Sequence, residues 1–287
     1  MESAGIEVKQ VAGALGAEIH GVDLSQSLSN SEFDAVHQAF LDHQVIFFRD
    51  QTITPEQHIE FGRRFGELDV HPFAAGLDDH PEIIHVLKEP KDHSGRTFGG
   101  GWHTDVTFYE KPALGSILYA LDVPESGGDT QFANMYAAYE TLSDGLKETL
   151  DGMTAVHSAS RAYGERGRAM HRDKESYSSM KVRTGPDAET EIEHPVIRTH
   201  PETGRKGLFV NRAFTVRFKG WTEAESMPLL EYLYNHAVRP EFTCRFRWEK
   251  GSIAFWDNRC THHFAINDYH GKRRSMHRVT VCGDRPV

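Results

Sequence analysis

The feature that most constrains the fold is a series of short strand-like segments that follow one another without regular alternation with helices. The segment from Phe242 to Trp248 alternates apolar and polar residues, and this period of two is typical of a half-buried strand. Lys250-Gly251 then supplies a turn into the apolar run Ile253-Ala254-Phe255-Trp256. Comparable segments predict strands at residues 44–49, 114–121, 130–132, 207–210 and 275–281. Many antiparallel strands with few helices predict a mainly β protein with flanking helices, folded as a double-stranded β-helix (jelly roll) and not as a doubly wound parallel sheet.

Helices are expected at four places, and the first two carry the clearest start signals. Ser29 with Glu32 forms a capping-box pattern, and Thr54 precedes Pro55 as a cap precedes a proline at the first helical position. We expect both helices to pack on the outside of a sheet. A third helix is predicted over residues 135–150. A fourth begins between residues 222 and 226, and its start stays open because Pro228 would remove a helical hydrogen bond.

The composition indicates a globular protein without a nucleic-acid or membrane partner. With 287 residues, of which 38% are hydrophobic and 26% charged, the chain can build an ample core, and we expect a single domain over residues 1–287. A net charge of −10 argues against nucleic acid, because a phosphate binder normally carries a basic patch. No apolar run approaches the roughly 20 residues that span a bilayer, and the first residues lack signal-peptide features, so a cytoplasmic location is expected.

The cysteines do not suggest a disulfide framework or a thiolate metal site. Cys244, Cys260 and Cys282 are odd in number and lack the Cys-x-x-Cys spacing. We therefore predict that all three are buried, reduced thiols.

A candidate metal site begins with His103 and Asp105. On an extended strand, residues two apart project to the same face, so one strand could aim both side chains at one ion. A third ligand at His263 would complete a two-histidine, one-carboxylate triad that leaves three positions open on non-haem Fe(II). The pair alone is weak evidence, because the chain has 18 histidines. His262 competes with His263, and since adjacent strand residues face opposite ways, only one of the two can reach the ion.

Over nearly its whole length, the sequence resembles the Fe(II)/2-oxoglutarate-dependent dioxygenases of the taurine dioxygenase and 2,4-D dioxygenase group. The matching motifs occur in the order of that family. They are Gly13-Ala14-Leu15-Gly16-Ala17-Glu18-Ile19, Gly21-Val22-Asp23-Leu24, Arg64-Phe65-Gly66-Glu67-Leu68, Trp102-His103-Thr104-Asp105-Val106-Thr107-Phe108, Gly127-Gly128-Asp129-Thr130, the run from His194 to Pro201, Leu208-Phe209-Val210-Asn211, and the segment from Trp256 to Arg278.

The resemblance implies an iron site and a cosubstrate site. His103, Asp105 and His263 would bind Fe(II), and the family pattern places its ligand at His263. Arg274 would receive the distal carboxylate of the cosubstrate 2-oxoglutarate through two parallel hydrogen bonds, and Thr130 would add a hydroxyl group. The alternative is that Arg274 belongs to a solvated charge run with its two basic neighbours. With O2, such enzymes convert 2-oxoglutarate to succinate and CO2 and hydroxylate their substrate.

The resemblance also implies a small anionic organic substrate, with contacts at His71, Val106, Phe214 and Arg278. Ala74, Gly99 and Ala159 stand where taurine-type enzymes have tyrosine, asparagine and phenylalanine. These replacements predict a wider pocket with fewer hydrogen bonds to a small amine, which argues against taurine itself. Other sulfonates and alkyl sulfates stay open, and so do aryloxypropionates of the dichlorprop type. Hydroxylation beside sulfur or an ether oxygen would give a product that breaks down.

Two other classes of function share parts of this pattern. A zinc hydrolase could use His103, Asp105 and His263 with an open water position, but it has no need for Arg274 at its family spacing. A non-catalytic jelly-roll binding protein would keep the fold without depending on these residues. The dioxygenase interpretation accounts for the triad and for Arg274 together. Similar enzymes are usually dimers or tetramers, so we also expect a homo-oligomer.

Overall fold

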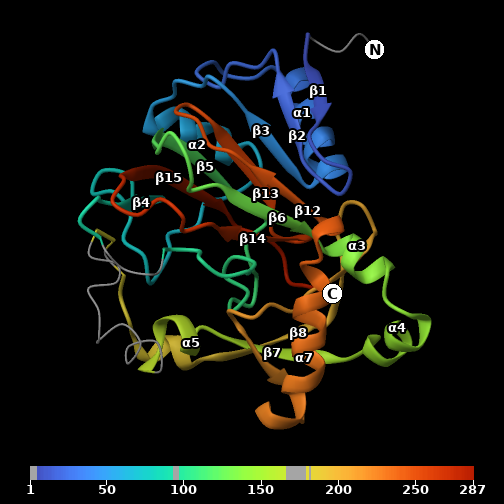
Figure 1. The fold of residues 1–287 in the computed structure, drawn as a ribbon. Coiled ribbons are helices and arrows are strands. Elements are labelled where there is room, and N and C mark those ends of the chain that lie inside the picture. Colours follow the sequence, from blue (N-terminus) through green and yellow to red (C-terminus); the bar gives the residue numbers. More distant parts are fainter. Residues whose placement is uncertain (1–4, 93–96, 166–178, 181) are drawn as a thin grey trace.

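Two facing sheets enclose the core of the protein in the computed structural model, which describes residues 5–92, 97–165, 179–180 and 182–287 (Figure 1). Within these residues the larger sheet has seven strands, in the order β1 (Glu7–Gln10), β2 (Ala17–His20), β3 (Val45–Phe48), β13 (Ile253–Asp257), β5 (Gly115–Asp122), β15 (Arg274–Val281) and β4 (Ile83–Lys88). Its neighbours pair antiparallel except β2 and β3. The sheet thus joins strands from both ends of the chain.

The second sheet consists of β12 (Thr243–Phe246), β6 (Thr130–Asn134) and β14 (Thr261–Ala265). Its apolar side chains face those of the larger sheet, and the Phe47 and Phe246 rings stack with centroids 4.0 Å apart. Phe132 and Trp256 meet in the same core, with ring centroids 5.6 Å apart. Two antiparallel layers around one core confirm the jelly-roll prediction.

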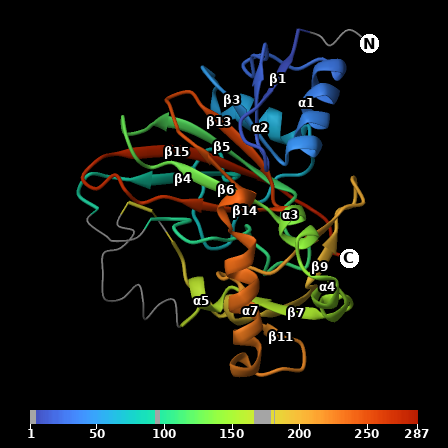
Figure 2. The ribbon, with the colours of Figure 1, turned by 45° about the vertical axis from the view of Figure 1, so that its right-hand side comes forward.

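Two helices cover the outer face of the larger sheet, as expected. They are α1 (Asn30–His43) and α2 (Pro55–Arg63), and Figure 2 shows both on the side away from α7 (Glu223–Ala237). The capping boxes at Ser29 and Thr54 are both formed. Phe40 of α1 stacks on Phe255 of β13, with ring centroids 4.1 Å apart. These contacts hold α1 and α2 against the outer face of the seven-stranded sheet, and its inner face stays free of them.

The remaining elements form a layer on the opposite side. Its sheets are β11-β7-β8 and β10-β9, with β7 (Thr154–Ser158), β8 (Glu191–Pro195), β9 (Ile197–Thr199), β10 (Lys206–Leu208) and β11 (Thr215–Phe218). Its helices are α3 (Met135–Glu140), α4 (Asp144–Leu150), α5 (Ser160–Tyr163), α7 and the 3-10 turns η1 (Pro186–Glu189) and η2 (Pro240–Phe242).

One helix prediction is wrong, and the structure gives the boundary that the sequence left open for another. The single helix over residues 135–150 is wrong, because Ser143 caps a new helix by accepting from the backbone N–H of Leu146. The helix near Thr222 begins at Glu223 and contains Pro228. It does not start later to avoid the proline, because Thr222 and Glu225 form a capping box that fixes its first turn.

The prediction that all three cysteines are buried is correct for two of them. Cys244 and Cys260 are buried free thiols, but Cys282 is exposed, because the chain leaves β15 at this point. In the described residues, no helix is long and apolar enough to cross a membrane.

Candidate active site

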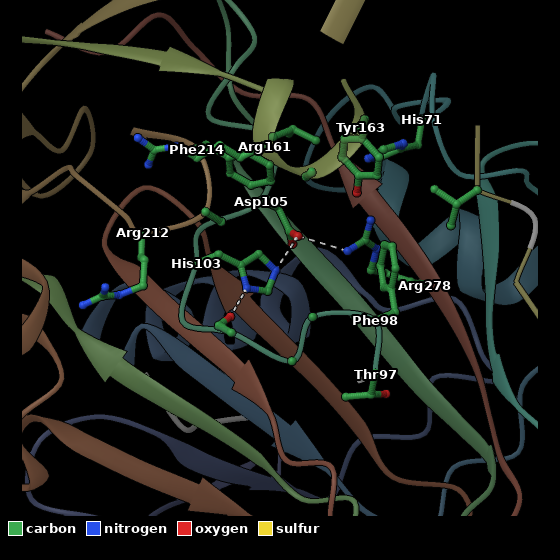
Figure 3. A pocket seen from close by; sticks show the side chains of 17 residues that line it. His71, Thr97, Phe98, His103, Asp105, Arg161, Tyr163, Arg212, Phe214 and Arg278 are labelled. Carbon is green, nitrogen blue, oxygen red and sulfur yellow. Dashed lines mark hydrogen bonds and ion pairs between the residues drawn. The ribbon is translucent and has the colours of Figure 1, made fainter. Parts of the chain in front are cut away.

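A cavity of about 570 Å³ lies against the inner face of the larger sheet (Figure 3). It brings together segments that are distant in sequence: the loop leading to Asp105, helix α5, the loop before β11, and strand β15. All four predicted substrate contacts line it, together with one triad pair: His71, Val106, Phe214, Arg278, His103 and Asp105.

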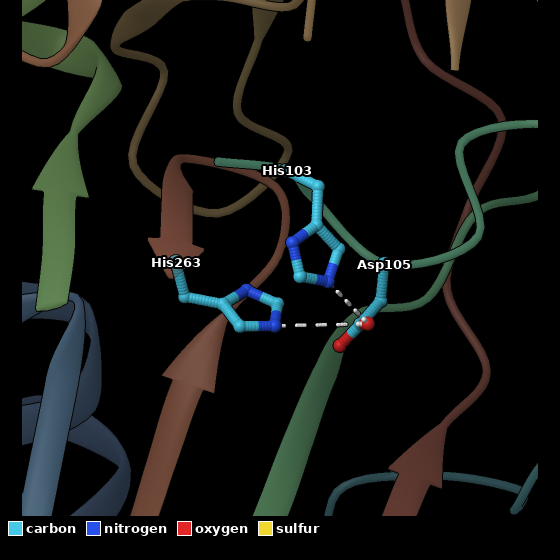
Figure 4. A group of neighbouring side chains, drawn as sticks. All are labelled: His103, Asp105 and His263. Atoms are coloured by element: carbon cyan, nitrogen blue, oxygen red, sulfur yellow. Dashed lines mark ion pairs between the residues drawn. The ribbon is translucent and has the colours of Figure 1, made fainter. Parts of the chain in front are cut away.

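The three predicted metal ligands meet at one end of this cavity (Figure 4). The Nε2 atoms of His103 and His263 lie 3.6 and 3.8 Å from Asp105 Oδ1. All three side chains are buried. Separations longer than a hydrogen bond leave room for an ion between donor atoms that could all contact it.

The local backbone differs from the extended strand that was expected. His103 forms a single antiparallel bridge with His263, through backbone hydrogen bonds of 3.1 and 2.8 Å. Asp105 then enters a turn in which Val106 has φ of 45°. Positive φ is unfavourable for a β-branched residue, so the surrounding packing must hold this turn. The turn, and not the alternation of a strand, brings Asp105 beside the histidines.

The protonation pattern suits the donation of nitrogen lone pairs. His103 Nδ1 lies 2.7 Å from the carbonyl oxygen of Gly101, so this nitrogen carries the proton and Nε2 is left as a lone-pair donor. Burial, reinforced by neighbouring His103, lowers the pKa of His263 well below its ordinary value, and its imidazole is therefore neutral. The competing His262 is also buried, but it is not part of the His103, Asp105 and His263 group.

Asp105 is held as a carboxylate by three neighbours. Arg278 Nη1 donates to Oδ1 at 3.0 Å, and Ser116 Oγ donates to Oδ2 at 2.8 Å. Burial alone would favour the protonated form, but the Arg278 guanidinium holds the pKa of Asp105 well below its usual range. Asn258 accepts from the backbone N–H of Asp105 at 3.3 Å and donates to Ser116 at 3.2 Å.

Sequence reasoning missed the positions of Ser116 and Asn258. A usable signal existed for the first, because Ser116 is a polar residue in an otherwise apolar segment predicted as a buried strand. Asn258 lies within the family motif from Trp256 to Arg278. Its role depends on a contact with Asp105 that the sequence does not show.

A second cluster of possible ligands is satisfied by the protein itself. His200 Nε2 lies 3.0 Å from Asp257 Oδ2, and His200 Nδ1 accepts from two backbone N–H groups. Asp257 also binds Arg259 through both of its carboxylate oxygens. Burial raises the pKa of the Cys260 thiol well above its ordinary value, which disfavours the thiolate that a metal needs. This cluster is therefore a structural ion pair.

Arg274 is buried away from the charge run to which it belongs in sequence. Lys272 and Arg273 point outward, and Arg273 binds Glu89 and Asp122. Arg274 is only 3% exposed, and its Nε and Nη2 atoms have no hydrogen-bond partner. Unpaired guanidinium nitrogens in the interior are costly unless an anion meets them.

Thr130 and Trp248 complete the surroundings of this arginine. Trp248 Nε1 donates to Thr130 Oγ1 at 3.0 Å, which leaves the hydroxyl proton of Thr130 available for another acceptor. The Arg274 guanidinium lies 5.8 Å from the Trp248 ring centroid. Neither Thr130 nor Arg274 lines the 570 Å³ cavity.

His71 and Arg278 form the polar end of the cavity. His71 Nδ1 accepts from the backbone N–H groups of Phe73 and Ala74 at 3.1 and 3.0 Å, so the ring proton lies on Nε2. Burial and the charge of Arg278 lower the pKa of His71 to about 3, which makes it a neutral donor at pH 7. An anion would meet one cation and one neutral N–H group here.

The predicted widening of the pocket holds only in part. Gly99 lines the cavity, and a Cβ there would lie 3.4 Å from His103 Cε1. Ala74 and Ala159 do not line it, because they are buried in packed apolar clusters. In the second of these clusters, Tyr163 stacks on Phe73 with ring centroids 4.8 Å apart. Neighbouring aromatic side chains thus fill space that a larger residue would occupy.

Comparisons with known proteins agree with this geometry. The model of the taurine catabolism dioxygenase TauD, TfdA family matches residues 7–280. An alpha-ketoglutarate-dependent sulfate ester dioxygenase of Pseudomonas putida is 40% identical over 98% of this chain and 91% of the relative. An alkylsulfatase of Acinetobacter baylyi is 36% identical over 97% and 86%. A taurine dioxygenase crystal structure from Burkholderia xenovorans is 40% identical, with a TM-score of 0.82 over 99% of this chain and 91% of that one.

The match over nearly the whole length and the shared fold lead to one assignment. The chain belongs to the TauD/TfdA family and is a 2-oxoglutarate-dependent non-haem iron dioxygenase.

Proposed function

We propose that His103, Asp105 and His263 bind Fe(II), and that Arg274 and Thr130 hold the distal carboxylate of 2-oxoglutarate. Two neutral imidazoles and one carboxylate suit Fe(II), and the unpaired Nε and Nη2 atoms of Arg274 suit a carboxylate. Bound iron, with 2-oxoglutarate and O2, supplies the chemistry that hydroxylates a substrate C–H bond and releases succinate and CO2. The protein orients the substrate for that step.

The proposed substrate is an alkyl sulfate ester or a related alkanesulfonate. The observation that carries this proposal is a cavity with His71 and Arg278 at one end and several apolar residues in the rest of its lining, among them Phe98, Ala162, Val182, Ala213 and Phe214. Such a lining suits a hydrocarbon chain and disfavours the ammonium group of taurine. The names of the Pseudomonas and Acinetobacter relatives support the same choice.

Two further arginines at the cavity do not add a second anion site. Arg161 donates to the backbone carbonyls of Thr215 and Val216 at 3.0 and 3.3 Å. Arg212 binds both carboxylate oxygens of Glu231 at 2.5 and 2.6 Å, and in Figure 3 it points away from Asp105. Their guanidinium groups are therefore already paired, which favours a substrate with one charged end.

Hydroxylation at the carbon that carries the ester oxygen would complete the reaction. The C–H bond becomes a C–OH bond, the C–O bond to sulfate then breaks, and the hydroxyl proton is lost. An alkyl sulfate would thus give an aldehyde and sulfate, together with succinate and CO2.

Release of succinate from 2-oxoglutarate in the presence of Fe(II) and O2 tests this function. Octyl sulfate and hexanesulfonate should raise the rate of succinate formation well above the rate measured without an organic substrate, and taurine should not. If only a dichlorprop-type aryloxypropionate supported succinate formation, the substrate would belong to that class instead. No succinate with any of these anions would contradict the proposal.

We expect Arg278→Lys to raise KM for octyl sulfate by about 10- to 100-fold. Lysine keeps the charge but loses the planar fork, and a hydrogen bond to a charged group contributes about 1.5–3 kcal/mol. Steady-state succinate release measures the change, and Arg212→Lys, whose side chain already binds Glu231, is the control. An unchanged KM in Arg278→Lys would remove this arginine from anion recognition.

Ser116→Ala is expected to weaken Fe(II) binding by about 10- to 100-fold, as losses of hydrogen bonds to metal ligands commonly do. Ser116 donates to Asp105 Oδ2, and without this hydrogen bond the carboxylate is no longer held in one orientation toward the ion. Competition with a metal-sensitive dye would measure the affinity. Thr280→Ala removes a hydroxyl that lies 3.4 Å from Ser116 Oγ, and it should leave the affinity nearly unchanged.

We also propose that the chain forms a single domain. The first and last strands, β1 and β15, belong to one sheet, and residues from both halves of the chain line the cavity.

A further inference from the structure

Lys88 occupies a position that makes it the neighbour of Arg274. Lys88 ends β4, Arg274 begins β15, and the two residues are directly opposite one another in the antiparallel pair. Residues in directly opposite positions project to the same face of a sheet with their Cβ atoms about 5 Å apart. The register therefore places two cationic side chains next to each other.

The face they share is the interior of the jelly roll. Alternate residues of β4 and β15 on the same face, Val86 and Met276, lie in the core between the sheets. The residues between them point the other way, where the rings of His85 and His277 meet with centroids 5.3 Å apart. Lys88 is accordingly only 7% exposed. A lysine directed to the interior is unusual and needs a reason.

The contacts of the Lys88 ammonium are polar but neutral. Nζ donates to Asn267 Oδ1 at 2.5 Å and lies 4.7 Å from the centroid of the Tyr269 ring. The Tyr269 hydroxyl in turn lies 3.2 Å from Thr97 Oγ1. Among charged neighbours, Asp92 has the largest effect on Lys88 and favours its protonated form.

Arg274 brings a second charge without an acidic partner. Its Nε and Nη2 atoms are buried and unpaired. The acidic group that acts on it electrostatically, Asp129, already binds Arg245 at 2.6 Å. Burial lowers the pKa of Lys88, Asp92 opposes this, and the proximity of Arg274 lowers it again. The interior end of β4 and β15 thus brings two positive charges together, and two nitrogens of one of them, Arg274 Nε and Nη2, have no hydrogen-bond partner.

We propose that Lys88 is a second cationic contact for the distal carboxylate of 2-oxoglutarate, beside Arg274. This inference rests on the proposed cosubstrate site. One guanidinium and one ammonium group would bind the same carboxylate, with the Thr130 hydroxyl as a third donor. Lys88 would then help the enzyme to select a 2-oxo dicarboxylic acid over a 2-oxo acid that lacks the distal carboxylate.

Equilibrium binding, without turnover, tests the role. Fe(II)-loaded protein is titrated anaerobically, and the visible metal-to-ligand charge-transfer band reports binding of 2-oxoglutarate or of 2-oxobutanoate, which lacks the distal carboxylate. Lys88→Met should weaken 2-oxoglutarate binding by about 10- to 100-fold, as expected for the loss of a charge-assisted hydrogen bond. It should leave the weaker binding of 2-oxobutanoate unchanged. Lys88→Arg should retain most of the affinity for 2-oxoglutarate.

Controls separate this role from a structural one. Asn267→Ala removes the hydrogen-bond partner of Lys88 but keeps the charge, and it should change 2-oxoglutarate affinity by less than about threefold. If Lys88→Met does not fold, judged by its thermal midpoint, Lys88→Gln provides the same comparison. Equal losses for both acids, or no loss for 2-oxoglutarate, would overturn the inference. If the wild-type protein did not bind 2-oxoglutarate, the proposed function itself would fail.

Discussion

Asp105→Ala should leave the protein without bound Fe(II) and without the charge-transfer band that 2-oxoglutarate gives with the wild type. The change removes the only carboxylate of the triad and leaves two imidazoles, whose ring centroids lie 4.1 Å apart. It also removes the buried partner of Arg278, whose Nη1 donates to Asp105 Oδ1. Breaking one partner of a buried pair commonly costs about 3–5 kcal/mol of stability. Loss of metal must therefore be separated from loss of fold.

A second substitution makes that separation possible. Asp105→Ala combined with Arg278→Met leaves no uncompensated charge at this position, so stability should return in part while Fe(II) binding stays absent. Iron content after desalting and urea unfolding of the metal-free proteins measure the two properties. Within β14, His263→Ala should lose iron and His262→Ala should retain it. Stoichiometric iron in Asp105→Ala would refute the assignment of this carboxylate as a ligand.

The metal-free protein is expected to lose stability steeply on acidification below pH 6.5. Burial lowers the pKa of both His58 and His71 to about 3, and it lowers the pKa of His157 well below the ordinary value. In the unfolded chain these groups titrate near 6.5. Between the two values the unfolded chain binds more protons than the folded protein, so the stability present above pH 6.5 falls with decreasing pH.

The magnitude follows from the number of such groups. Each buried neutral histidine contributes at most about 1.4 kcal/mol per pH unit, so these three alone give about 4 kcal/mol per pH unit. His262, His263 and His277, whose pKa values are also lowered, add to that slope in the metal-free protein. Urea unfolding at pH 7.5, 6.5 and 5.5, with a chelator present, measures the free energy of unfolding. His58→Gln, a change in α2, should reduce the slope by about 1.4 kcal/mol per pH unit at most. A flat profile between pH 7.5 and 5.5 would be incompatible with neutral burial of these residues.

The strands and the ligand set were the parts of the structure that sequence patterns could predict. The period of two in the segment now seen as β12, and the capping boxes at Ser29 and Thr54, are local signals that the tertiary structure preserves. The grouping of His103 and Asp105 with His263 was predicted from the triad pattern and the family order. Their proximity could be predicted because the ligand types that such a site requires are few and its chemistry demands that they converge.

The contacts between distant segments could not be predicted. The spacing of His103 and Asp105 suggested a strand, but the observed turn depends on packing around Val106, which no local pattern encodes. The replacements at Ala74 and Ala159 suggested open space, but aromatic neighbours from other segments fill it. Lys88 appeared in sequence as one of many charges, and its position beside Arg274 depends on the register of β4 with β15.

The backbone bridge between His103 and His263 implies that the protein folds before it binds its metal ion. Because two hydrogen bonds join these residues directly, the imidazoles are gathered by folding and not by the metal. The conformational entropy of bringing the two imidazoles together is lost during folding, before an ion binds. Small metal-dependent domains, which remain unfolded until loaded, behave differently. This scaffold should therefore release and regain its ion as a folded, preorganised receptor.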